Sequence, residues 1–225
     1  VAIIATPDEV HLENMRQLAD LGVKEFIVEK PLANNLKETD EIIVFANERG
    51  LKVVGAGQVF TSDAADKVKE VMRAHNFQPA QCLFYWTKDR AGRSLSGENM
   101  ANPHIFTFDL FHEIGWAIDM FGETAGVKYA YTRDMEVHGQ EAISNHGLGA
   151  VFSEHKSGVQ SISFMSFTEP GRFQDNQKTV NIVGRDGSVV IADLAADERH
   201  GETVIYIDAQ GRKEVYPVNE NTITM

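Results

Sequence analysis

The first 57 residues alternate short apolar runs with longer stretches of helical periodicity. The runs Val1 to Ala5 and Phe26 to Val28 are apolar throughout, which is typical of parallel strands covered by helices on both faces. The alternation predicts two strand–helix units and a closing strand. The expected strands are 1–6, 24–29 and 52–56, and the expected helices are about 8–22 and 36–50.

The first of these helices has an apolar face and a termination signal. Four apolar residues share that face: Val10, Met15, Leu18 and Leu21. Gly22 stands where a C-cap glycine is expected, because glycine adopts a left-handed conformation without steric cost.

Beyond residue 80 the pattern changes to strands joined by hairpin turns. The expected strands are 80–87, 126–132, 149–155, 158–167, 178–184, 187–194, 202–208 and 212–217. The expected turns are Lys156-Ser157-Gly158, Asp186-Gly187 and Gln210-Gly211. A helix at about 62–75, with Ser62 or Asp63 as its N-cap, precedes them. A long helix at about 108–121, closed by Gly122, interrupts them.

These patterns predict a fold of two parts. Residues 1–60 form an α/β part with a parallel sheet. Residues 61–225 form an α+β part, a large and mostly antiparallel open sheet packed on the long helix. The other face of such a sheet is free to meet a partner. The alternating apolar residues of 159–167 and 189–192 fit a dimer or tetramer interface, and one solvated face explains them almost as well.

Charge and cysteine content exclude several classes of function. The chain has 21 Lys and Arg against 33 Asp and Glu, and its net charge of −12 would repel nucleic acid and anionic membrane surfaces. Cys82, the one cysteine, cannot form an internal disulfide. No run reaches the roughly 18 apolar residues of a membrane-spanning helix, and no basic, apolar leader opens the sequence. A cytoplasmic protein is therefore expected.

Glu29-Lys30-Pro31 follows the second expected strand, at the edge where open α/β sheets bind ligands. A lysine there can donate a proton or stabilise an alkoxide by its charge. Pro31 is compatible with a cis peptide bond, which would aim the Lys30 side chain at this edge. A surface lysine before a helix-starting proline is the alternative, and the tripeptide alone favours that alternative.

Thr6-Pro7 ends the first expected strand at the same edge, and His11 lies on the first turn of the helix that follows. Free backbone N–H groups at that helix start could bind a ligand. His11 could instead pack against or cap the helix, which is the more common role of a lone histidine.

Asp109 and His112 are three residues apart in the long helix and therefore share one helix face. Asp109 could orient His112 and stabilise its protonated form, which makes His112 a candidate general base toward a hydroxyl group. An equally weighted alternative has Asp109 as a helix cap and His112 as a half-buried polar residue. Glu113 is expected to point away from this face.

Other catalytic signatures are missing from the sequence. It contains no His/Cys cluster with zinc spacing, no Gly-x-Ser-x-Gly motif and no Walker loop. Asp134, Glu136 and His138 alternate as in a strand and could ligate a metal, but a solvated strand edge explains them better. No metal site is expected.

Three motifs together resemble the glucose-fructose oxidoreductase and inositol dehydrogenase (Gfo/Idh/MocA) superfamily. They are Ala5-Thr6-Pro7 with His11, Glu29-Lys30-Pro31, and His112-Glu113-Ile114. The resemblance covers essentially the whole chain, because the later strands also match the family's substrate and oligomerisation domain. It implies an NAD(P)-dependent oxidoreductase that transfers a hydride between nicotinamide and a hydroxyl or ketone of a sugar, polyol or nucleotide sugar.

The resemblance also implies a role for each site residue. Residues 1–60 would be the C-terminal part of a dinucleotide-binding Rossmann domain, and residues 61–225 the substrate-binding and oligomerisation domain. Lys30 would lie near the nicotinamide and the substrate hydroxyl, and His112, oriented by Asp109, would act as acid or base. The residues expected to bind NAD or NADP are Thr6, Pro7, His11, Glu29, Lys30 and Gln58.

Three departures from the family pattern bear on these roles. The family usually begins with a strand, a Gly-x-Gly-x-x-Gly turn and a helix, then a strand with the ribose-binding residue, and this sequence contains none of these. Family members also tend to continue into a further helix, whereas this sequence ends at Met225. Finally, Gly115 and Phe108 stand where the family often has carboxylates. The pyrophosphate and adenosine therefore have no evident site in these residues.

Two other hypotheses are compatible with the sequence. A non-catalytic ligand-binding or assembly protein, derived from this family by loss of the cofactor fingerprint, would keep the open sheet for binding or dimerisation. The same scaffold could also catalyse a redox-neutral reaction with a bound cofactor. Net charge slightly favours neutral sugars or polyols over anionic sugar nucleotides, although Lys88, Arg90 and Arg93 could form a local basic patch.

Overall fold

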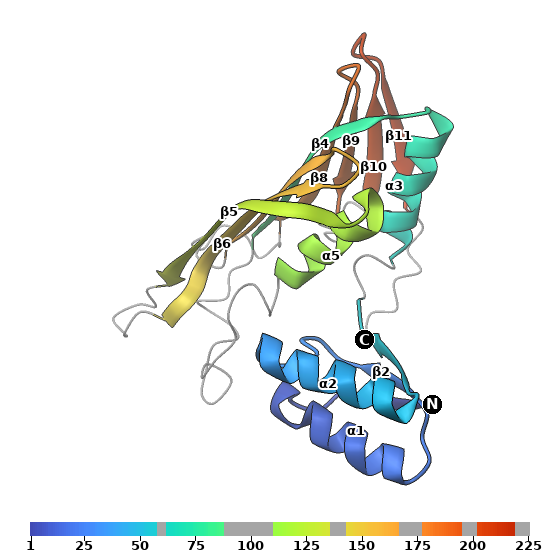
Figure 1. Ribbon diagram of the computed structural model, residues 1–225. Helices are drawn as coiled ribbons and strands as arrows, with labels where there is room; N and C mark the ends of the chain where they lie inside the picture. Colours follow the sequence, from blue (N-terminus) through green and yellow to red (C-terminus); the bar gives the residue numbers. More distant parts are fainter. Residues whose placement is uncertain (58–61, 88–109, 136–142, 167–176, 195–201, 219–225) are drawn as a thin grey trace. The chain divides into compact units, whose positions relative to one another are not determined.

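The computed structural model describes residues 1–57, 62–87, 110–135, 143–166, 177–194 and 202–218. The chain forms two compact units, Val1–Gln58 and Val59–Met225 (Figure 1). The first contains β1 (Ala2–Ile4), the 3-10 helix η1 (Asp8–Val10), α1 (His11–Asp20), β2 (Glu25–Val28), α2 (Leu36–Arg49) and β3 (Lys52–Gly55). The second contains α3 (Asp63–Ala74), β4 (Pro79–Thr87), α5 (Leu110–Phe121), β5 (Thr124–Met135), β6 (Ile143–His155), β7 (Gln160–Ser166), β8 (Gln177–Gly184), β9 (Val189–Asp193), β10 (Thr203–Ile207) and β11 (Lys213–Pro217).

The strands of the first unit form a parallel sheet in the order β1-β2-β3. Ile4, Phe26 and Val28 lie on one face of this sheet and pack with Met15 of α1 and Ile42 of α2 in one apolar core. The predicted strand–helix alternation of this region is therefore confirmed.

Both helices of the first unit cover the same face of the sheet. Ile3, Ile27 and Val54 project from the opposite face, with exposed fractions of 73%, 40% and 50%. The expected cover of helices on both faces is therefore wrong for the described residues. Strand order gives the reason, because successive right-handed crossovers that run in one direction place their helices on one side.

The predicted apolar face of the first helix is correct at its centre and wrong at its ends. Met15 is buried, whereas Val10 and Leu21 are exposed. Val10 belongs to η1 and Leu21 is the C-cap of α1, so neither residue continues the helical face. The predicted termination is confirmed, since Gly22 has a φ of +93°.

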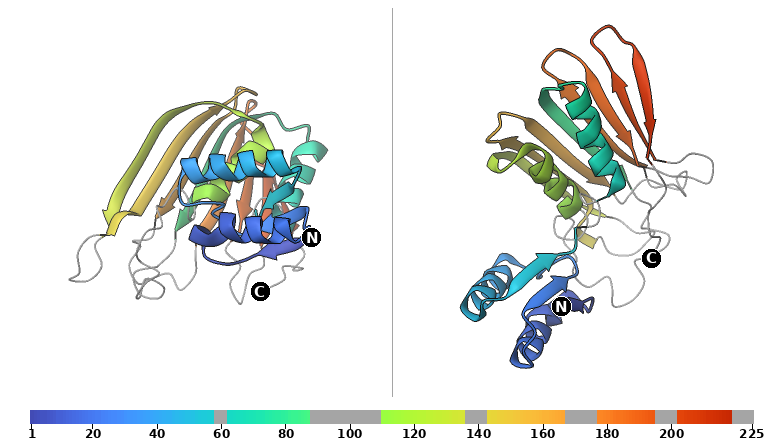
Figure 2. Two further views of the ribbon diagram at one scale, coloured as in Figure 1. Left: turned by 60° about the horizontal axis from the view of Figure 1, so that its bottom comes forward. Right: turned by 90° about the vertical axis from the view of Figure 1, so that its right-hand side faces the viewer.

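The second unit is an eight-stranded sheet in the order β11-β10-β9-β8-β4-β7-β6-β5. The β4–β7 pair is parallel and the other pairs are antiparallel. Helices α3 and α5 lie on one face of it (Figure 2), where Val68 and Trp116 share an apolar core with Trp86, Ile182 and Val190 of the sheet. The expected open sheet packed on helices is confirmed.

Two neighbouring strands, β5 and β6, are longer than expected. They begin at Thr124 and Ile143, ahead of the starts expected at 126 and 149. At Gly147 the two strands approach so closely that a Cβ atom would lie 2.5 Å from the Asp134 carbonyl oxygen. Glycine at this position permits the close pairing. Because glycine has no side chain, it interrupts the apolar alternation by which a strand is recognised in the sequence.

Asn35 caps the N-terminus of α2, which predicts a measurable loss of stability on its removal. Its Oδ1 accepts the Glu38 backbone N–H at 3.0 Å, and Glu38 Oε2 accepts the Asn34 backbone N–H at 3.2 Å. Asn35→Ala leaves the Glu38 N–H without this acceptor and should lower the free energy of unfolding by about 1 kcal/mol. Asn35→Asp keeps the acceptor and is the control. Urea unfolding followed by circular dichroism measures both, and equal losses would contradict the cap.

Candidate functional site

The carboxyl ends of the three parallel strands meet at one edge of the first unit. Each pairing continues by one hydrogen bond past the strand ends, Glu29 N–H to Ile4 O and Ala56 N–H to Val28 O, both at 2.8 Å. Thr6, Lys30 and Gly57 follow these adjacent ends, with Lys30 after the central strand. The parallel pairing of the three strands thus brings two predicted site segments, 6–7 and 29–30, to the edge where parallel sheets bind ligands.

Lys30 leaves the sheet in a constrained segment. The Lys30–Pro31 peptide bond is cis, and both Glu29 and Lys30 are half-buried. The Glu29 carboxylate Oε2 accepts the Lys30 backbone N–H at 3.0 Å. A partly shielded ammonium group at a strand end can hold a developing negative charge on a ligand oxygen better than a fully solvated one can.

His11 is fully buried beneath this edge, with an exposed fraction of 0%. Its Nε2 lies 2.8 Å from the Thr6 carbonyl oxygen and its Nδ1 lies 3.2 Å from the Leu32 carbonyl oxygen. Each ring nitrogen thus lies against a backbone carbonyl oxygen, and the ring has no accessible surface. This burial fits the packing alternative for His11, and its expected contact with a cofactor stays a prediction.

In the second unit, α5 places His112 against β4. His112 is buried, and its ring lies 6.2 Å from that of Trp86 at an interplanar angle of 28°. Glu113, expected on another face, is also fully buried. His112 is thus more deeply buried than the half-buried residue of the alternative. An imidazole shielded from bulk water can still serve as an acid or base if a substrate reaches it, so its proposed role stays a prediction.

Sequence reasoning missed Trp86, a neighbour of His112, and Lys178, which lies over the Trp86 ring. The Lys178 Nζ lies 5.3 Å from the Trp86 ring centroid, a distance at which the ring's negative face attracts a cation. The two residues face each other in the β4–β8 register. Alternation along β4 predicts that Trp86 faces the helices, but the pairing of β4 with the distant β8 cannot be read from the sequence.

Two predicted site residues, Gln58 and Asp109, lie outside the described residues, as do Glu136 and His138. Their proposed roles remain predictions. Lys30 belongs to the first unit and His112 to the second. Within the described ranges, no group of three or more His, Cys, Asp or Glu side chains could hold a metal ion.

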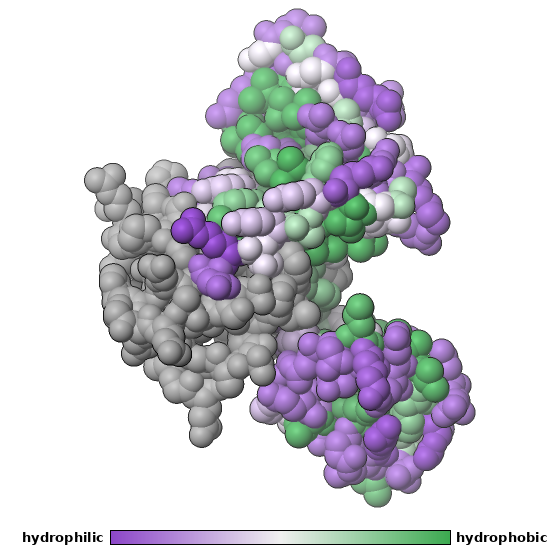
Figure 3. All heavy atoms as spheres, turned by 60° about the vertical axis from the view of Figure 1, so that its left-hand side comes forward, coloured by the Kyte–Doolittle hydropathy of each residue, from purple (hydrophilic) through white to green (hydrophobic). Residues whose placement is uncertain are grey.

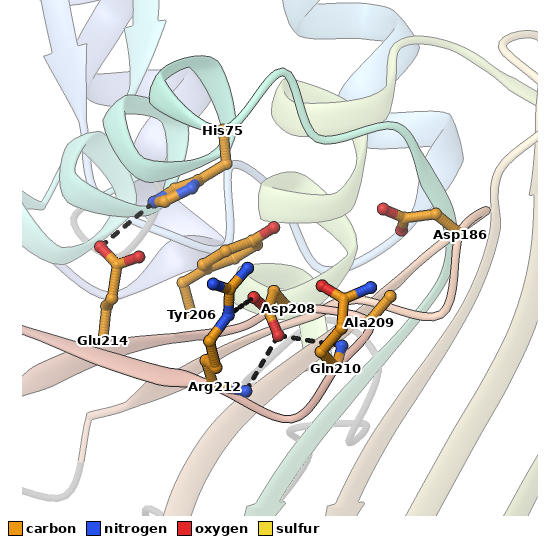
Figure 4. Close-up of a pocket in the computed structure, with 8 residues that line it drawn as sticks. All are labelled: His75, Asp186, Tyr206, Asp208, Ala209, Gln210, Arg212 and Glu214. Atoms are coloured by element: carbon orange, nitrogen blue, oxygen red, sulfur yellow. Dashed lines mark hydrogen bonds and ion pairs between the residues drawn. The ribbon is translucent and has the colours of Figure 1, made fainter.

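A separate hollow of about 590 Å³ lies beside the β10–β11 hairpin of the second unit (Figure 4). It is lined by His75, Asp186, Tyr206, Asp208, Ala209, Gln210, Arg212 and Glu214. None of the predicted site residues is among them. Asp208 accepts the backbone N–H groups of Gln210 and Arg212, both at 2.9 Å, and the Arg212 Nε–H at 2.6 Å. The bond from the Arg212 backbone is the main reason why the pKa of Asp208 is lowered.

His75 joins this hairpin to the end of α3. Its ring stacks on Tyr206 with centroids 3.7 Å apart, and its Nε2 lies 2.9 Å from the Tyr216 Oη. Tyr216 in turn donates to Glu214 Oε2 at 2.6 Å. These polar groups bind one another. We therefore interpret the hollow as part of the packing between the end of α3 and the β10–β11 hairpin, and not as a ligand site.

Comparison with known proteins gives matches over both units. Residues 1–75 match the profile of the oxidoreductase family with an NAD-binding Rossmann fold. The scyllo-inositol 2-dehydrogenase (NADP(+)) IolU of Bacillus subtilis is 26% identical over 208 residues, which are 87% of this chain and 58% of the relative.

Solved structures share the fold. An oxidoreductase from Agrobacterium radiobacter, in complex with NAD+, L-tartaric acid and magnesium, has a TM-score of 0.77 at 16% identity over 99% of this chain and 62% of its own. Levoglucosan dehydrogenase, in complex with NADH and L-sorbose, has a TM-score of 0.75 at 18% identity over 96% of this chain and 59% of its own. The chain thus spans about three fifths of the length of these proteins.

The Tyr216–Glu214 hydrogen bond predicts that the Tyr216 hydroxyl loses its proton at a higher pH than an ordinary tyrosine does. Mainly because of this bond, and less because of burial and the Glu214 charge, the pKa of Tyr216 is raised from 10.0 to about 12. Between these values the folded chain holds a proton that the unfolded chain has lost. The stabilisation is therefore complete below pH 10 and is lost as the pH rises toward 12.

Ultraviolet titration of the tyrosines measures this pKa, with Tyr216→Phe identifying the step. Glu214→Gln removes the charged acceptor and should move the Tyr216 step to lower pH. A Tyr216 step already at its ordinary pKa in the wild-type chain would contradict the bond.

Proposed function

We propose that this chain transfers a hydride between NAD or NADP and a small molecule. Its residues 1–75 match the NAD-binding Rossmann oxidoreductase family that its motifs predict. The substrate would be a sugar, polyol or nucleotide sugar, oxidised at a hydroxyl group or reduced at a ketone. The observation that carries this proposal is Lys30 at the centre of the parallel-sheet edge, inside the segment that matches the family. An inositol dehydrogenase and a levoglucosan dehydrogenase among the similar proteins support the substrate class.

The nicotinamide end of a dinucleotide would bind at the described edge. Residues 1–60 would form the cofactor-binding part and residues 61–225 the substrate-binding and oligomerisation part. Thr6, Pro7, Glu29 and Lys30, together with Gln58, would line the nicotinamide. The sequence contains no Gly-x-Gly-x-x-Gly turn, so these residues supply no glycine-rich turn for the pyrophosphate.

The residues of the chain would manage the proton while a bound nicotinamide supplies or accepts the hydride. In the oxidative direction His112 removes the hydroxyl proton, and in the reductive direction it returns that proton to the ketone oxygen. Lys30 would stabilise a developing alkoxide by its positive charge. Asp109 would orient the His112 ring.

We also propose that the chain forms a homodimer or homotetramer through the uncovered face of the eight-stranded sheet. Leu83, Ile162 and Val183 are exposed on that face. Tyr85 and Phe164, opposite each other in the β4–β7 pair, stack with centroids 5.2 Å apart. Figure 3 shows one side of this unit, where hydrophobic and hydrophilic residues both reach the surface. An apolar face of this kind is typical of a protein–protein interface.

A cytoplasmic location remains a prediction. Its support is Cys82, a buried thiol whose pKa burial raises well above its usual value, as in an inert structural cysteine. Among the described residues, the helices are all too short or too polar to cross a bilayer.

Loss of Lys30 or His112 tests the proposed chemistry. Lys30→Met and His112→Asn should each lower kcat by about 100-fold to 10,000-fold, because each removes a proton-transfer or charge-stabilising group. Lys37→Met, at an exposed position on α2, is the matched control. Reduced-nicotinamide absorbance measures the rate on a panel of sugars and polyols. Retained cofactor binding without turnover on any substrate would favour the non-catalytic alternative.

A charge on the open sheet face tests the proposed assembly. Ile162→Lys places an ammonium group at the centre of the face and should shift the mass in solution from an oligomer to a monomer, as light scattering after gel filtration measures. Ile118→Lys is the control, because Ile118 is equally exposed, 42% against 43%, but lies on α5. A wild-type monomer, or dissociation of both variants alike, would contradict an interface on this face.

A further inference from the structure

We infer that His11 is a positioning residue, which sets the place of Lys30 by tying together the two backbone segments of the sheet edge. Its ring reaches from the Thr6 carbonyl, after β1, to the Leu32 carbonyl, two residues after Lys30. The inference rests on the proposed function, because only then does the place of Lys30 affect a reaction.

The chemistry of the contact suits a fixed spacer. Both partners are backbone carbonyl oxygens, which accept hydrogen bonds and cannot donate them. A neutral imidazole carries one N–H and donates to one of the two carbonyls, whereas a doubly protonated ring donates to both. The two ring nitrogens have a rigid separation, and the ring is fully buried. A hydrogen bond shielded from water in this way resists exchange with solvent, and its loss would leave buried carbonyl groups with fewer partners.

The contact falls at the middle of the segment that carries Lys30. That segment is anchored at its start by the Glu29 N–H bond to β1 and near its end by the Asn34 N–H bond to Glu38 of α2. The Leu32 carbonyl lies between these two anchors. His11 therefore holds the segment where Lys30, next to the cis Lys30–Pro31 bond, has left the sheet.

The expected effect follows from the precision that catalysis requires. A displacement of about 1 Å at a catalytic group can lower a rate by about 100-fold, even when the mutated residue is remote from the chemistry. A change at His11 that releases Leu32 should therefore lower kcat by about that factor. The affinity for the substrate, read as KM, should change less.

Two conservative variants distinguish the two contacts of the His11 ring, one with the Thr6 carbonyl and one with the Leu32 carbonyl, which together form the His11 bridge. Asn places an amide near the position of Nδ1 and can keep the bond to Leu32, whereas Gln reaches the position of Nε2 and can keep the bond to Thr6. We therefore expect His11→Asn to retain most of kcat and His11→Gln to lose most of it. Asn14→Ala is the control, because Asn14 donates to the Thr6 Oγ1 at 2.9 Å and does not touch the Leu32 carbonyl.

A double-variant cycle distinguishes positioning from a purely structural role. If His11 acts through Lys30, His11→Gln should lower kcat in the wild-type chain but add no further loss to Lys30→Met. Equal losses in both backgrounds, or an unchanged kcat in the folded His11→Gln chain, would overturn the inference.

A readout without activity keeps the inference separate from the proposed function. Backbone amide resonances in the ¹H–¹⁵N NMR spectrum of the full chain report the position of the Lys30 segment. His11→Gln should shift the resonances of residues 30–33, and His11→Asn should shift them much less. If these shifts occur but Lys30→Met leaves turnover unchanged, the bridge stands and the proposed role of Lys30 fails. Unchanged resonances for 30–33 in His11→Gln would overturn the bridge itself.

Discussion

The pairing of three short parallel strands is the constraint on which the proposed chemistry depends. Because β2 lies between β1 and β3, the segments after these strands emerge side by side, and the central one carries Lys30. The apolar core beneath holds this arrangement through Phe26 and Val28, which are almost completely buried. Strand order therefore brings the candidate site segments together, and the side chains of those segments, such as Lys30, would supply the chemistry.

Much of this could be predicted from the sequence where local signals are strong. Apolar strands, an N-cap at Ser62 and turn glycines such as Gly187 and Gly211 all mark elements that the structure contains. Features that depend on strand order or on pairing between distant strands could not be predicted from the sequence. The uncovered Ile3–Ile27–Val54 face follows from the direction of two crossovers, and the meeting of Trp86 with Lys178 follows from the β4–β8 register.

The candidate site shows the same division. Strand position was enough to predict that Thr6, Glu29 and Lys30 share one sheet edge, because parallel strand ends gather at one edge. Their roles in binding or catalysis came from the family resemblance. The place of His11 required the structure, since a histidine on a first helical turn can face either a ligand or the chain's own backbone. In the fold its ring meets two carbonyl oxygens that are far apart in the sequence, Thr6 and Leu32. The expected contact of His11 with the cofactor stays a prediction, and the two carbonyl contacts are the observation behind its inferred role in positioning Lys30.

The central claim is that the described sheet edge receives the nicotinamide of a dinucleotide. Calorimetric titration of the full chain with NADH and with NADPH, on material of verified mass and folded by circular dichroism, tests it most directly. We expect saturable binding of at least one of the two dinucleotides, and weaker binding when Lys30 is replaced. A folded chain that binds neither dinucleotide would contradict it.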